Sequence, residues 1–288
     1  MSEVDVSTEE LETGRLSPEH LDQATAALKL DGLIFLKNVV DTIHLDILQE
    51  RMLLDLQTIL ARGDVPFQFN TGNVQQDPPP FPPYLFRDIL VNPFVIAVSK
   101  AILGPGLQNT FYSGNTALPG GSRQPVHSDT HHLWPNLEVA HPAHLLVVNV
   151  PIVDMDAQNG STEIWLGTHL DTTMGSQMGS IRVPEAAIER RRAISPPIQP
   201  DVKRGNVLIR DMRLWHAGMP NQTDQPRPMI AMVHQVRWLA AGKLTFQKGS
   251  EDVLGGSDLS TPAEFVEGPI DYLHHHRSYD FKPEEAAN

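Results

Sequence analysis

The sequence predicts an α+β fold in which N-terminal helices brace a β-barrel or β-sandwich. Before Leu107, apolar side chains recur at helical spacing, and the helical segments end at glycine. From about Leu107 onward, short apolar or alternating runs separated by Gly, Pro and Asn dominate, as is typical of strands. Helices followed by strands favour an α+β layout. Since no repeat and no linker divides the 288 residues, we expect a single domain over 17–288.

The N-terminal part is expected to hold helices after a flexible acidic tail at 1–16. Ser17 caps the first helix, because its side chain can accept a backbone hydrogen bond, and Pro18 suits the first helical position. Gly32 ends this helix, and a short buried strand follows at 33–36. The later helical stretches run over 41–62 and, with a break at Asn92-Pro93, up to Gly104.

The C-terminal part is expected to be built mainly of strands. The predicted strands are 108–113, 124–127, 144–151, 161–165, 206–210, 214–216 and 229–238. One helix, at 184–192, interrupts them. A polar tail begins at about 250, and we interpret its three consecutive histidines, 274–276, as a solvated run rather than a metal-binding tract.

The segment 64–84 differs in character from its surroundings. It carries six prolines together with Gly72, Asn70 and Asn73, so it can be neither a helix nor a central strand. A long irregular loop inside a compact domain is usually a lid or a binding loop. We therefore interpret 64–84 as a candidate substrate lid, with a proline-rich surface connection as the alternative.

Composition excludes several classes of function. The chain has no cysteine, so any metal must be held by His, Asp or Glu. Its net charge of -13 argues against nucleic-acid and anionic-membrane partners. The N-terminus lacks the apolar core of a signal peptide, and no apolar run approaches the roughly 20 residues of a membrane span. We expect a cytoplasmic protein that acts on a small molecule, either as a monomer or as a homodimer.

Three residues form a candidate metal site. On a strand, residues i and i+2 project from the same face, so His127 and Asp129 offer an imidazole and a carboxylate toward one point. His216, in a second predicted strand, would complete a set of two histidines and one carboxylate. Such a set leaves one side of an octahedral ion open, as Fe(II) oxygenases require. Arg227, eleven residues after His216, can grip the distal carboxylate of 2-oxoglutarate.

These residues resemble those of the phytanoyl-CoA dioxygenase family of Fe(II)/2-oxoglutarate oxygenases. Two segments carry the resemblance besides His216 and Arg227: QPVHSD at 124–129 and NGSTEIWLGTH at 159–169. Within the family, the chain looks most like the kanamycin B dioxygenase branch, which oxidises secondary metabolites. The segments shared with that branch are 74–79, 112–115, 132–135, 189–192 and 213–216.

The resemblance implies a fold, a set of cofactors and a reaction. It implies a double-stranded β-helix, or jelly-roll, core with Fe(II) bound by His127, Asp129 and His216. Gln124 and Thr162 would bind 2-oxoglutarate beside Arg227. O₂ and 2-oxoglutarate would be converted to succinate and CO₂ while an unactivated C–H bond is hydroxylated, or desaturated or otherwise oxidised. Because related halogenases carry a small residue where Asp129 stands, halogenation is disfavoured.

Five further residues are candidates for the substrate pocket, and each has a simpler interpretation. They are Gln76, Asn115, His132, Trp134 and Trp165. Turn chemistry explains Asn115 as well as a substrate contact does, core packing explains the tryptophans, and His132 can be an ordinary loop residue.

Two other classes of function remain open. A jelly-roll zinc hydrolase or a non-catalytic binding module could use the same histidines and aspartate, but neither needs a carboxylate-gripping arginine. An acidic chain suits the phosphates of a CoA ester poorly, so a neutral or cationic natural product is the expected substrate.

Overall fold

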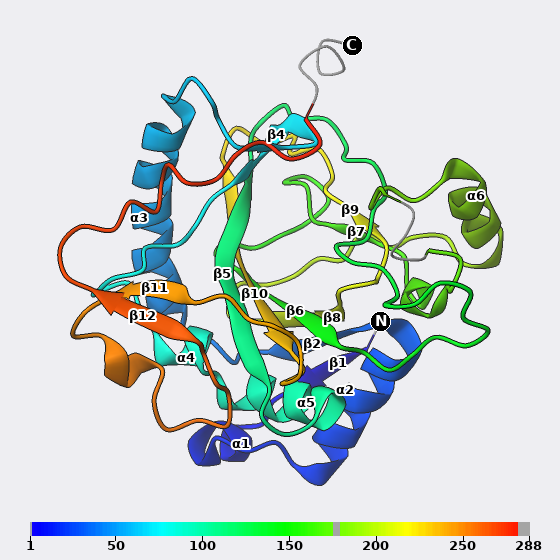
Figure 1. The fold of residues 1–288 in the computed structure, drawn as a ribbon, viewed down its shortest axis with the longest axis horizontal. Helices are drawn as coiled ribbons and strands as arrows, with labels where there is room; N and C mark the ends of the chain where they lie inside the picture. The colour runs from blue at the N-terminus through cyan, green and yellow to red at the C-terminus, as the bar shows by residue number, and fades with distance from the viewer. Residues whose placement is uncertain (1, 175–178, 282–288) are drawn as a thin grey trace.

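A mixed eight-stranded sheet forms the centre of the computed structural model, which describes residues 2–174 and 179–281 (Figure 1). The strand order is β1-β2-β8-β6-β10-β5-β4-β3, and neighbouring strands are antiparallel except for β1 and β2. The strands are β1 (Glu3–Asp5), β2 (Leu33–Lys37), β3 (Phe67–Gln68), β4 (Asn70–Gln75), β5 (Gln108–Ala117), β6 (Leu145–Pro151), β8 (Val207–Asp211) and β10 (Arg227–Gln235).

A second, smaller layer faces this sheet. It contains the pair β7 (Glu163–Ile164) and β9 (His216–Ala217), which is extended by isolated bridges from His127 to His216 and from Ile164 to Ile198. Two opposed layers of mainly antiparallel strands are the arrangement of a jelly roll. A separate parallel pair is made by β11 (Leu244–Gln247) and β12 (Ala263–Val266).

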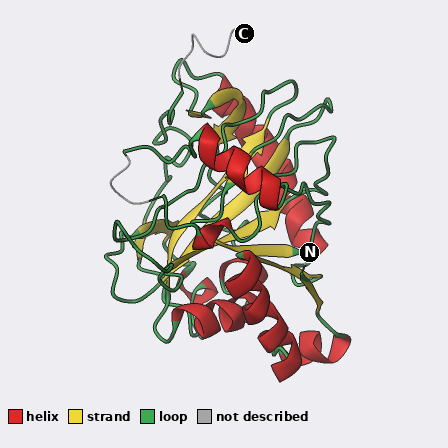
Figure 2. Cartoon of the chain, turned by 90° about the vertical axis from the view of Figure 1, so that its right-hand side faces the viewer, coloured by secondary structure: helices red, strands yellow, loops and turns green. Residues whose placement is uncertain are grey.

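Helices cover the outer face of the main sheet (Figure 2). Helix α2 contacts β1, β2 and β8, α5 contacts β6, and α3 contacts β10. The helices are α1 (Thr8–Thr13), α2 (Pro18–Asp31), α3 (Thr42–Leu60), α4 (Arg87–Leu90), α5 (Pro93–Leu103) and α6 (Glu185–Ile194), with short 3₁₀ turns at Thr168–Leu170 and Glu251–Val253.

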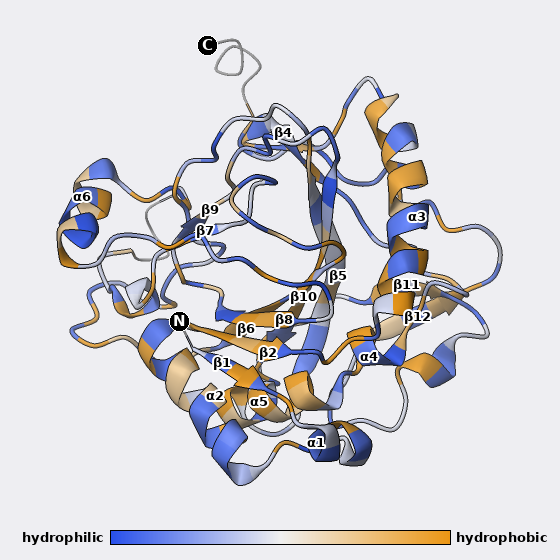
Figure 3. Ribbon diagram, turned by 180° about the vertical axis from the view of Figure 1, so that it is seen from behind, coloured by the Kyte–Doolittle hydropathy of each residue, from blue (hydrophilic) through white to orange (hydrophobic). Residues whose placement is uncertain are grey.

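Successive side chains of a strand point to opposite faces of the main sheet, so one face packs against the helices and the other lines a cavity. Even-numbered positions of β10, such as Ile230 and Met232, join the large core under the helices. The ribbons of α3 and α5 carry many hydrophobic residues, drawn orange in Figure 3. Odd-numbered positions of β10, Met229 among them, point to the other face and line a cavity. In β8 the same alternation sends Ile209 to the core and Leu208 and Arg210 to the cavity. The alternation of side chains along β8 and β10 therefore determines which residues line the cavity.

Most predicted elements of the fold are confirmed. The α+β class with a double-stranded β-helix core and N-terminal helices is the observed architecture. The first helix has its N-cap at Ser17 and its C-cap at Gly32, which has a positive φ of 79°. Segment 124–127 is not a strand, although His127 makes single bridges to His216 and Arg182. None of the described helices is both long and apolar enough to cross a membrane.

Two predicted irregular segments are more ordered than expected. The prediction of a flexible tail at 1–16 is wrong, because Glu3–Asp5 pairs with β2 and α1 has a capping box between Ser7 and Glu10. The lid candidate 64–84 begins with the hairpin β3–β4 at the sheet edge, and only its second half is irregular. The polar tail from about 250 likewise includes β12. Whether 64–84 moves as a lid stays a prediction.

Candidate active site

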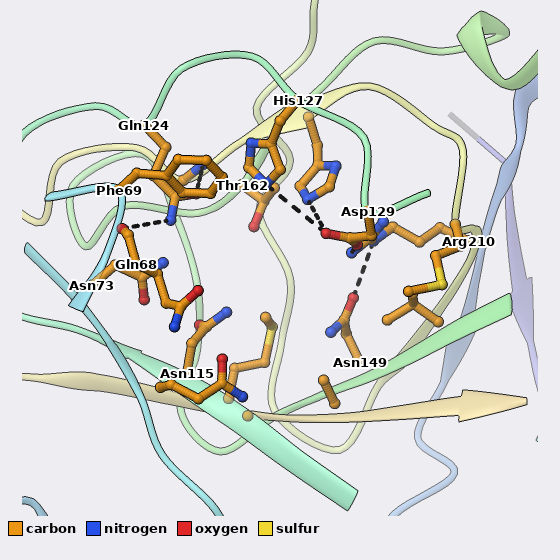
Figure 4. Close-up of a pocket in the computed structure, with 18 of the residues that line it drawn as sticks. Gln68, Phe69, Asn73, Asn115, Gln124, His127, Asp129, Asn149, Thr162 and Arg210 are labelled. Atoms are coloured by element: carbon orange, nitrogen blue, oxygen red, sulfur yellow. Dashed lines mark hydrogen bonds and ion pairs between the residues drawn. The ribbon is translucent and has the colours of Figure 1, made fainter. Parts of the chain in front are cut away.

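A cavity of about 380 Å³ lies between the two layers of the jelly roll, on the face of the main sheet opposite the helices (Figure 4). Of the predicted site residues, seven line it: Asn115, Gln124, His127, Asp129, Thr162, His216 and Arg227. They come from the main sheet, from the smaller layer and from the loop that joins β5 to β6. The fold thus brings together residues that lie more than a hundred positions apart in sequence.

His127, Asp129 and His216 converge on one point of this cavity. The Nε2 atoms of His127 and His216 lie 3.9 Å and 3.6 Å from Oδ1 of Asp129. Two ligands at about 2.1 Å from one ion lie about 3–3.5 Å apart, so the three atoms are spaced only slightly wider than the ligands of a bound metal. Both histidine side chains are buried.

The backbone fixes how the two imidazoles face the cavity. Nδ1 of His127 hydrogen-bonds to the carbonyl of Pro125 at 2.9 Å, and Nδ1 of His216 to the carbonyl of Leu214 at 3.0 Å. A carbonyl accepts only, so each Nδ1 must carry a proton and each Nε2 is left with its lone pair toward Asp129. Metal-binding histidines are commonly oriented by such a hydrogen bond.

Charges around the three residues favour the protonation states that a cation needs. Burial lowers the pKa of His216 well below its usual value, and the charge of Arg210 acts in the same direction; burial also lowers the pKa of His127. Burial raises the pKa of Asp129, but Arg210 and the two imidazoles outweigh it, so the pKa lies well below its usual range. Neutral imidazoles beside an ionised carboxylate form a set ready to bind a metal ion.

Arg210 is a site residue that the sequence analysis missed. Its Nη2 donates to Oδ2 of Asp129 at 2.5 Å, and its Nε donates to Oδ1 of Asn149 at 3.4 Å. This leaves the other carboxylate oxygen, Oδ1, facing both imidazoles. A detectable signal was present, because Arg210 is a charged residue inside the buried run VLIRD of β8. Buried charges of this kind need a partner and often mark a site.

Arg227 lies in the same cavity as a buried cation. Its guanidinium donates to the carbonyls of Asn159 and Gly160 at 3.2 Å and 3.1 Å, and Nη1 contacts the sulfur of Met155 at 3.4 Å. Burial lowers the pKa of Arg227 to about 10. Among the described residues, no carboxylate forms an ion pair with it. A buried guanidinium without a counter-charge is costly unless an anion binds beside it.

The other two predicted 2-oxoglutarate contacts also face the cavity. Gln124 is held by two backbone contacts: its Oε1 accepts a hydrogen bond from the amide of Gly218 at 2.8 Å, and its Nε2 donates to the carbonyl of Gln68 at 3.5 Å. Thr162 lies beside His127 in Figure 4, just after the loop whose carbonyls hold Arg227. Their role in binding 2-oxoglutarate stays a prediction.

Three carboxamide side chains on β4 and β5 also line the cavity, and we call them the carboxamide wall: Asn73, Gln75 and Asn115. In Figure 4, Asn73 and Asn115 lie across the cavity from His127 and Asp129. Gln75 and Asn115 are directly paired across the two strands. Gln75 donates to Oγ of Ser113 at 2.6 Å, whereas Oδ1 of Asn73 is buried and has no hydrogen-bond partner among the described residues. Among the described residues that line the cavity, only Asp129, Arg210 and Arg227 carry a full charge, since the two histidines are neutral.

Four of the five predicted substrate-pocket residues lie elsewhere. Gln76 is buried and joins the carbonyl of Met52 to the hydroxyl of Thr116 at 2.6 Å each, on the far side of the strand from Gln75. His132 belongs to a separate polar cluster, in which its Nδ1 is 3.2 Å from the guanidinium of Arg213. Both predictions are corrected, since these side chains complete hydrogen bonds of the scaffold.

The prediction that Trp134 and Trp165 line the substrate pocket is also corrected. Trp165 is fully buried in a small apolar core with Trp215, and its Nε1 donates to Glu163 at 2.9 Å. Trp134 is 55% exposed and contacts only the ring of His141 edge-on among the described aromatic contacts. Of the pocket predictions, Asn115 alone lines the cavity.

Two aromatic residues near the cavity were not predicted as site residues. The ring of Phe69 lies 4.5 Å from the ring of His127, between centroids, and 5.8 Å from that of Tyr279. Phe69 has a positive φ of 65° at the tip of the β3–β4 hairpin, and it lines the cavity. Tyr279 comes from the C-terminal segment, where the sequence gives no signal, because its place depends on pairing with Phe67 and Phe69.

A jelly roll with two imidazoles and a carboxylate at its centre defines a class of metal-dependent proteins, and comparison with known proteins identifies the family. The sequence profile described as "Phytanoyl-CoA dioxygenase (PhyH)" matches residues 28–229. The chain belongs to the phytanoyl-CoA dioxygenase family. This confirms the predicted family; the likeness to the kanamycin B dioxygenase branch stays a prediction.

A curated relative is similar to this chain over most of its length. "Dioxygenase af480" of Aspergillus fumigatus is 28% identical over 218 residues. The match covers 73% of this chain and 65% of that protein, so the chain spans less than two thirds of the relative's length.

Three solved structures share the fold at low sequence identity. AviO1 from Streptomyces viridochromogenes Tue57 has a TM-score of 0.56 and 20% identity, covering 77% of this chain and 97% of its own. The alpha-ketoglutarate-dependent carbocyclase SnoK from nogalamycin biosynthesis has a TM-score of 0.55 and 17% identity, covering 88% and 94%. The epimerase SnoN, solved with Fe3+, alpha-ketoglutarate and nogalamycin RO, has a TM-score of 0.59 and 15% identity, covering 91% and 99%.

Proposed function

We propose that this chain is an Fe(II)/2-oxoglutarate-dependent dioxygenase that hydroxylates, or otherwise oxidises, an unactivated C–H bond of a small, uncharged natural product. The observation that carries the proposal is Arg227, a buried guanidinium without a carboxylate partner among the described residues, in the same cavity as His127, Asp129 and His216. A hydrolase or a binding module has no use for such a cation beside a metal site.

The residues present fit both groups that the family implies. His127, Asp129 and His216 would hold the iron, because their ligand atoms lie within 4.8 Å of one another and both Nε2 atoms are free to bind. Arg227 would hold the distal carboxylate of 2-oxoglutarate, with Gln124 and Thr162 beside it. When bound, the iron activates O₂ while 2-oxoglutarate is converted to succinate and CO₂, which supplies the oxidising power for the C–H bond.

The protein's own residues would orient the metal ligands and keep water out of the cavity. Arg210 holds one oxygen of Asp129, so that the other is presented to the ion. Phe69 covers the ring of His127 on the cavity side, and a dry wall there protects the reaction from water. The apolar residues of β10 on the cavity face, Met229 and Val233 among them, give the substrate a surface to pack against.

The carboxamide wall supports an uncharged substrate with hydrogen-bonding oxygens. Asn73, Gln75 and Asn115 offer donors and acceptors but no charge, and the charged side chains are gathered around the proposed iron and 2-oxoglutarate. A cavity of about 380 Å³ suits a small molecule. Two structural neighbours are named in connection with nogalamycin: SnoK comes from nogalamycin biosynthesis, and SnoN was solved with nogalamycin RO. This supports a secondary metabolite over an acyl-CoA. The predicted cytoplasmic location and the oligomeric state stay predictions.

The experiment needs no substrate. Under anaerobic conditions, Fe(II) followed by 2-oxoglutarate should give a weak charge-transfer band near about 500 nm in the wild-type protein. Arg227→Ala should lose the band at 2-oxoglutarate concentrations that saturate the wild type, and His216→Ala should lose it at any concentration. Arg204→Ala is the control, because Arg204 pairs with Asp46 away from the cavity and should keep the band. No band in the wild type, together with tight zinc binding, would replace the proposal with the hydrolase or binding-module alternative.

A further inference from the structure

The C-terminal segment 271–281, which we call the C-terminal strap, runs from the end of the β11–β12 pair to the edge of the cavity (Figure 1). Tyr279, on this strap, pairs through its backbone with Phe67 and Phe69 of the β3–β4 hairpin. The guanidinium of Arg62 donates to the carbonyls of Leu273 and His276 at 2.7 Å and 3.0 Å. The strap is therefore docked along its length, and it supplies one residue, Tyr279, to the cavity lining.

Two consecutive histidines of the strap converge on one buried carboxylate. Nε2 of His275 lies 3.0 Å from Oδ2 of Asp77, and Nε2 of His276 lies 2.7 Å from Oδ1 of the same residue. Asp77 follows β4 directly, and its side chain is only 12% exposed. The two imidazole rings lie 4.0 Å apart at an angle of 42°. The preceding histidine, His274, turns away and contacts Asp271 instead, at 2.6 Å.

The surroundings of this cluster suit a cation with an open coordination position. Asp77 has no Lys or Arg partner among the described residues, and only the imidazoles balance its charge. His275 is half-exposed, so an ion can enter from solvent. A cavity of about 470 Å³, lined by Asp77, His275, Tyr112 and Tyr272, adjoins the cluster and gives room for a water ligand.

We propose that Asp77, His275 and His276 form a second metal site, for Zn²⁺, that fastens the C-terminal strap to the loop after β4. Two imidazoles and a carboxylate are ligands of zinc sites that keep one position for water. The nitrogen–oxygen distances of 2.7 Å and 3.0 Å already approach those between ligands sharing one ion, about 3–3.5 Å, so small side-chain movements suffice. The ion would replace any proton shared between the imidazoles and the carboxylate.

This second site is independent of the proposed oxygenase site. The two share no ligand, and they lie on different elements: one on the β5–β6 loop and β9, the other on the loop after β4 and the strap. Zinc bound by His275 and His276 would fix the strap three positions before Tyr279, and so hold Tyr279 and its contact with Phe69 at the cavity edge.

The test counts zinc in a protein whose first site is disabled. After chelator treatment, the variant His127→Ala/His216→Ala should bind one equivalent of Zn²⁺ in a calorimetric titration, and Zn²⁺ should raise its melting temperature. Adding Asp77→Asn, which keeps the shape of the side chain, should abolish both effects. Adding His275→Ala, at a half-exposed position that folding tolerates, should abolish them as well.

His274→Ala in the same background is the matched control, because this neighbouring histidine faces Asp271 and should leave the zinc equivalent unchanged. The proposal is overturned if the background variant binds no zinc, or if it binds zinc equally well after Asp77→Asn or His275→Ala. Absence of the charge-transfer band from the wild-type protein with Fe(II) and 2-oxoglutarate would instead contradict the oxygenase function. The two proposals can therefore fail separately.

Discussion

Arg210 shows how a single residue can determine the geometry of the proposed iron site. It is a charged side chain on the cavity face of β8, and it pairs with Oδ2 of Asp129 at 2.5 Å. Its Nη1 is buried and finds no hydrogen-bond partner in the part of the chain that the structure describes. Removing it would free Asp129 to rotate, and would leave the carboxylate without its nearest fixed charge. Removing a residue that hydrogen-bonds to a metal ligand typically lowers metal affinity by about 10–100-fold.

We therefore expect Arg210→Met to weaken Fe(II) or Co²⁺ binding by about 10–100-fold, with Arg210→Lys in between. Metal titration of the apo-protein, followed by calorimetry, measures this directly. Arg227→Met is the matched control, since it also removes a buried arginine of the cavity but does not touch Asp129. Equal metal affinity in Arg210→Met and the wild type would show that Arg210 does not position the carboxylate.

Arg227 carries a different prediction, about stability. Its buried charge lacks an anionic partner among the described residues, so the carboxylate of 2-oxoglutarate should stabilise the folded wild type. At about 100 times its dissociation constant, a ligand adds roughly 2.7 kcal/mol to the free energy of unfolding. We expect 2-oxoglutarate, in the presence of a non-reactive divalent metal, to raise the melting temperature of the wild type but not of Arg227→Met. A comparable rise in both proteins would exclude Arg227 as the carboxylate partner.

At the scale of elements, local sequence patterns predicted the helices and strands whose positions depend on interactions between residues close in sequence. The helix from Ser17 to Gly32 was predicted with its ends, because a capping side chain and a left-handed glycine lie within the segment itself. The strands β6, β8 and β10 were predicted from apolar runs. Strand β1 was missed, since its only buried apolar residue is Val4 and its pairing with β2 is a contact across some thirty positions. No local pattern can report such a contact.

The same limit applies to the site. His127, Asp129, His216 and Arg227 were predicted because their spacing in sequence carries the chemistry. The sequence could not show that Gln76 points away from the cavity while Gln75 lines it, since that depends on the register of β4 against β5. Nor could it place Tyr279 or Asp77 with His276, because these contacts join segments about two hundred positions apart.

The N-terminal helix α1 gives a prediction about pH. Glu10 accepts hydrogen bonds from the amides of Ser7 and Ser17 at 2.8 Å and 2.6 Å, and contacts His20. Burial raises the pKa of Glu10, but these hydrogen bonds together lower it by more, so the pKa falls from 4.5 to about 2. Since the folded-state pKa is the lower one, the ionised side chain stabilises the fold above about pH 4.5 and this stabilisation is lost as the pH falls toward 2.

Glu10→Gln should therefore cost about 1 kcal/mol of unfolding free energy at pH 7, and the difference from the wild type should shrink as the pH falls below 4.5. Urea unfolding at several pH values measures it. Glu12→Gln is the control, because Glu12 is exposed on the same helix and its replacement should leave the free energy of unfolding unchanged at every pH. A difference that stays constant with pH would mean that the charge of Glu10 is not responsible.

At the scale of the whole molecule, the proposed metal joins a rigid part of the fold to an irregular one. His216 lies in β9, whereas His127 and Asp129 lie in residues 118–144, which join β5 to β6 without forming a helix or a strand. A few backbone hydrogen bonds hold this loop to the smaller layer, among them those from His127 to His216 and from Asp129 to Met212. An ion bound by all three side chains would act as a crosslink between the loop and the jelly roll.

Metal binding should therefore slow amide hydrogen exchange mainly in residues 118–144, because local opening of the loop then requires breaking metal–ligand bonds. Exchange in β6 and β10, which are paired on both sides within the main sheet, should change little. Hydrogen exchange followed by mass spectrometry, with and without a non-reactive divalent metal, resolves the two regions. The variant His127→Ala/His216→Ala should show no change in the loop, and a protection spread evenly over the sheet would contradict a crosslink at this site, because it would mean that the metal stabilises the molecule globally rather than through His127 and Asp129.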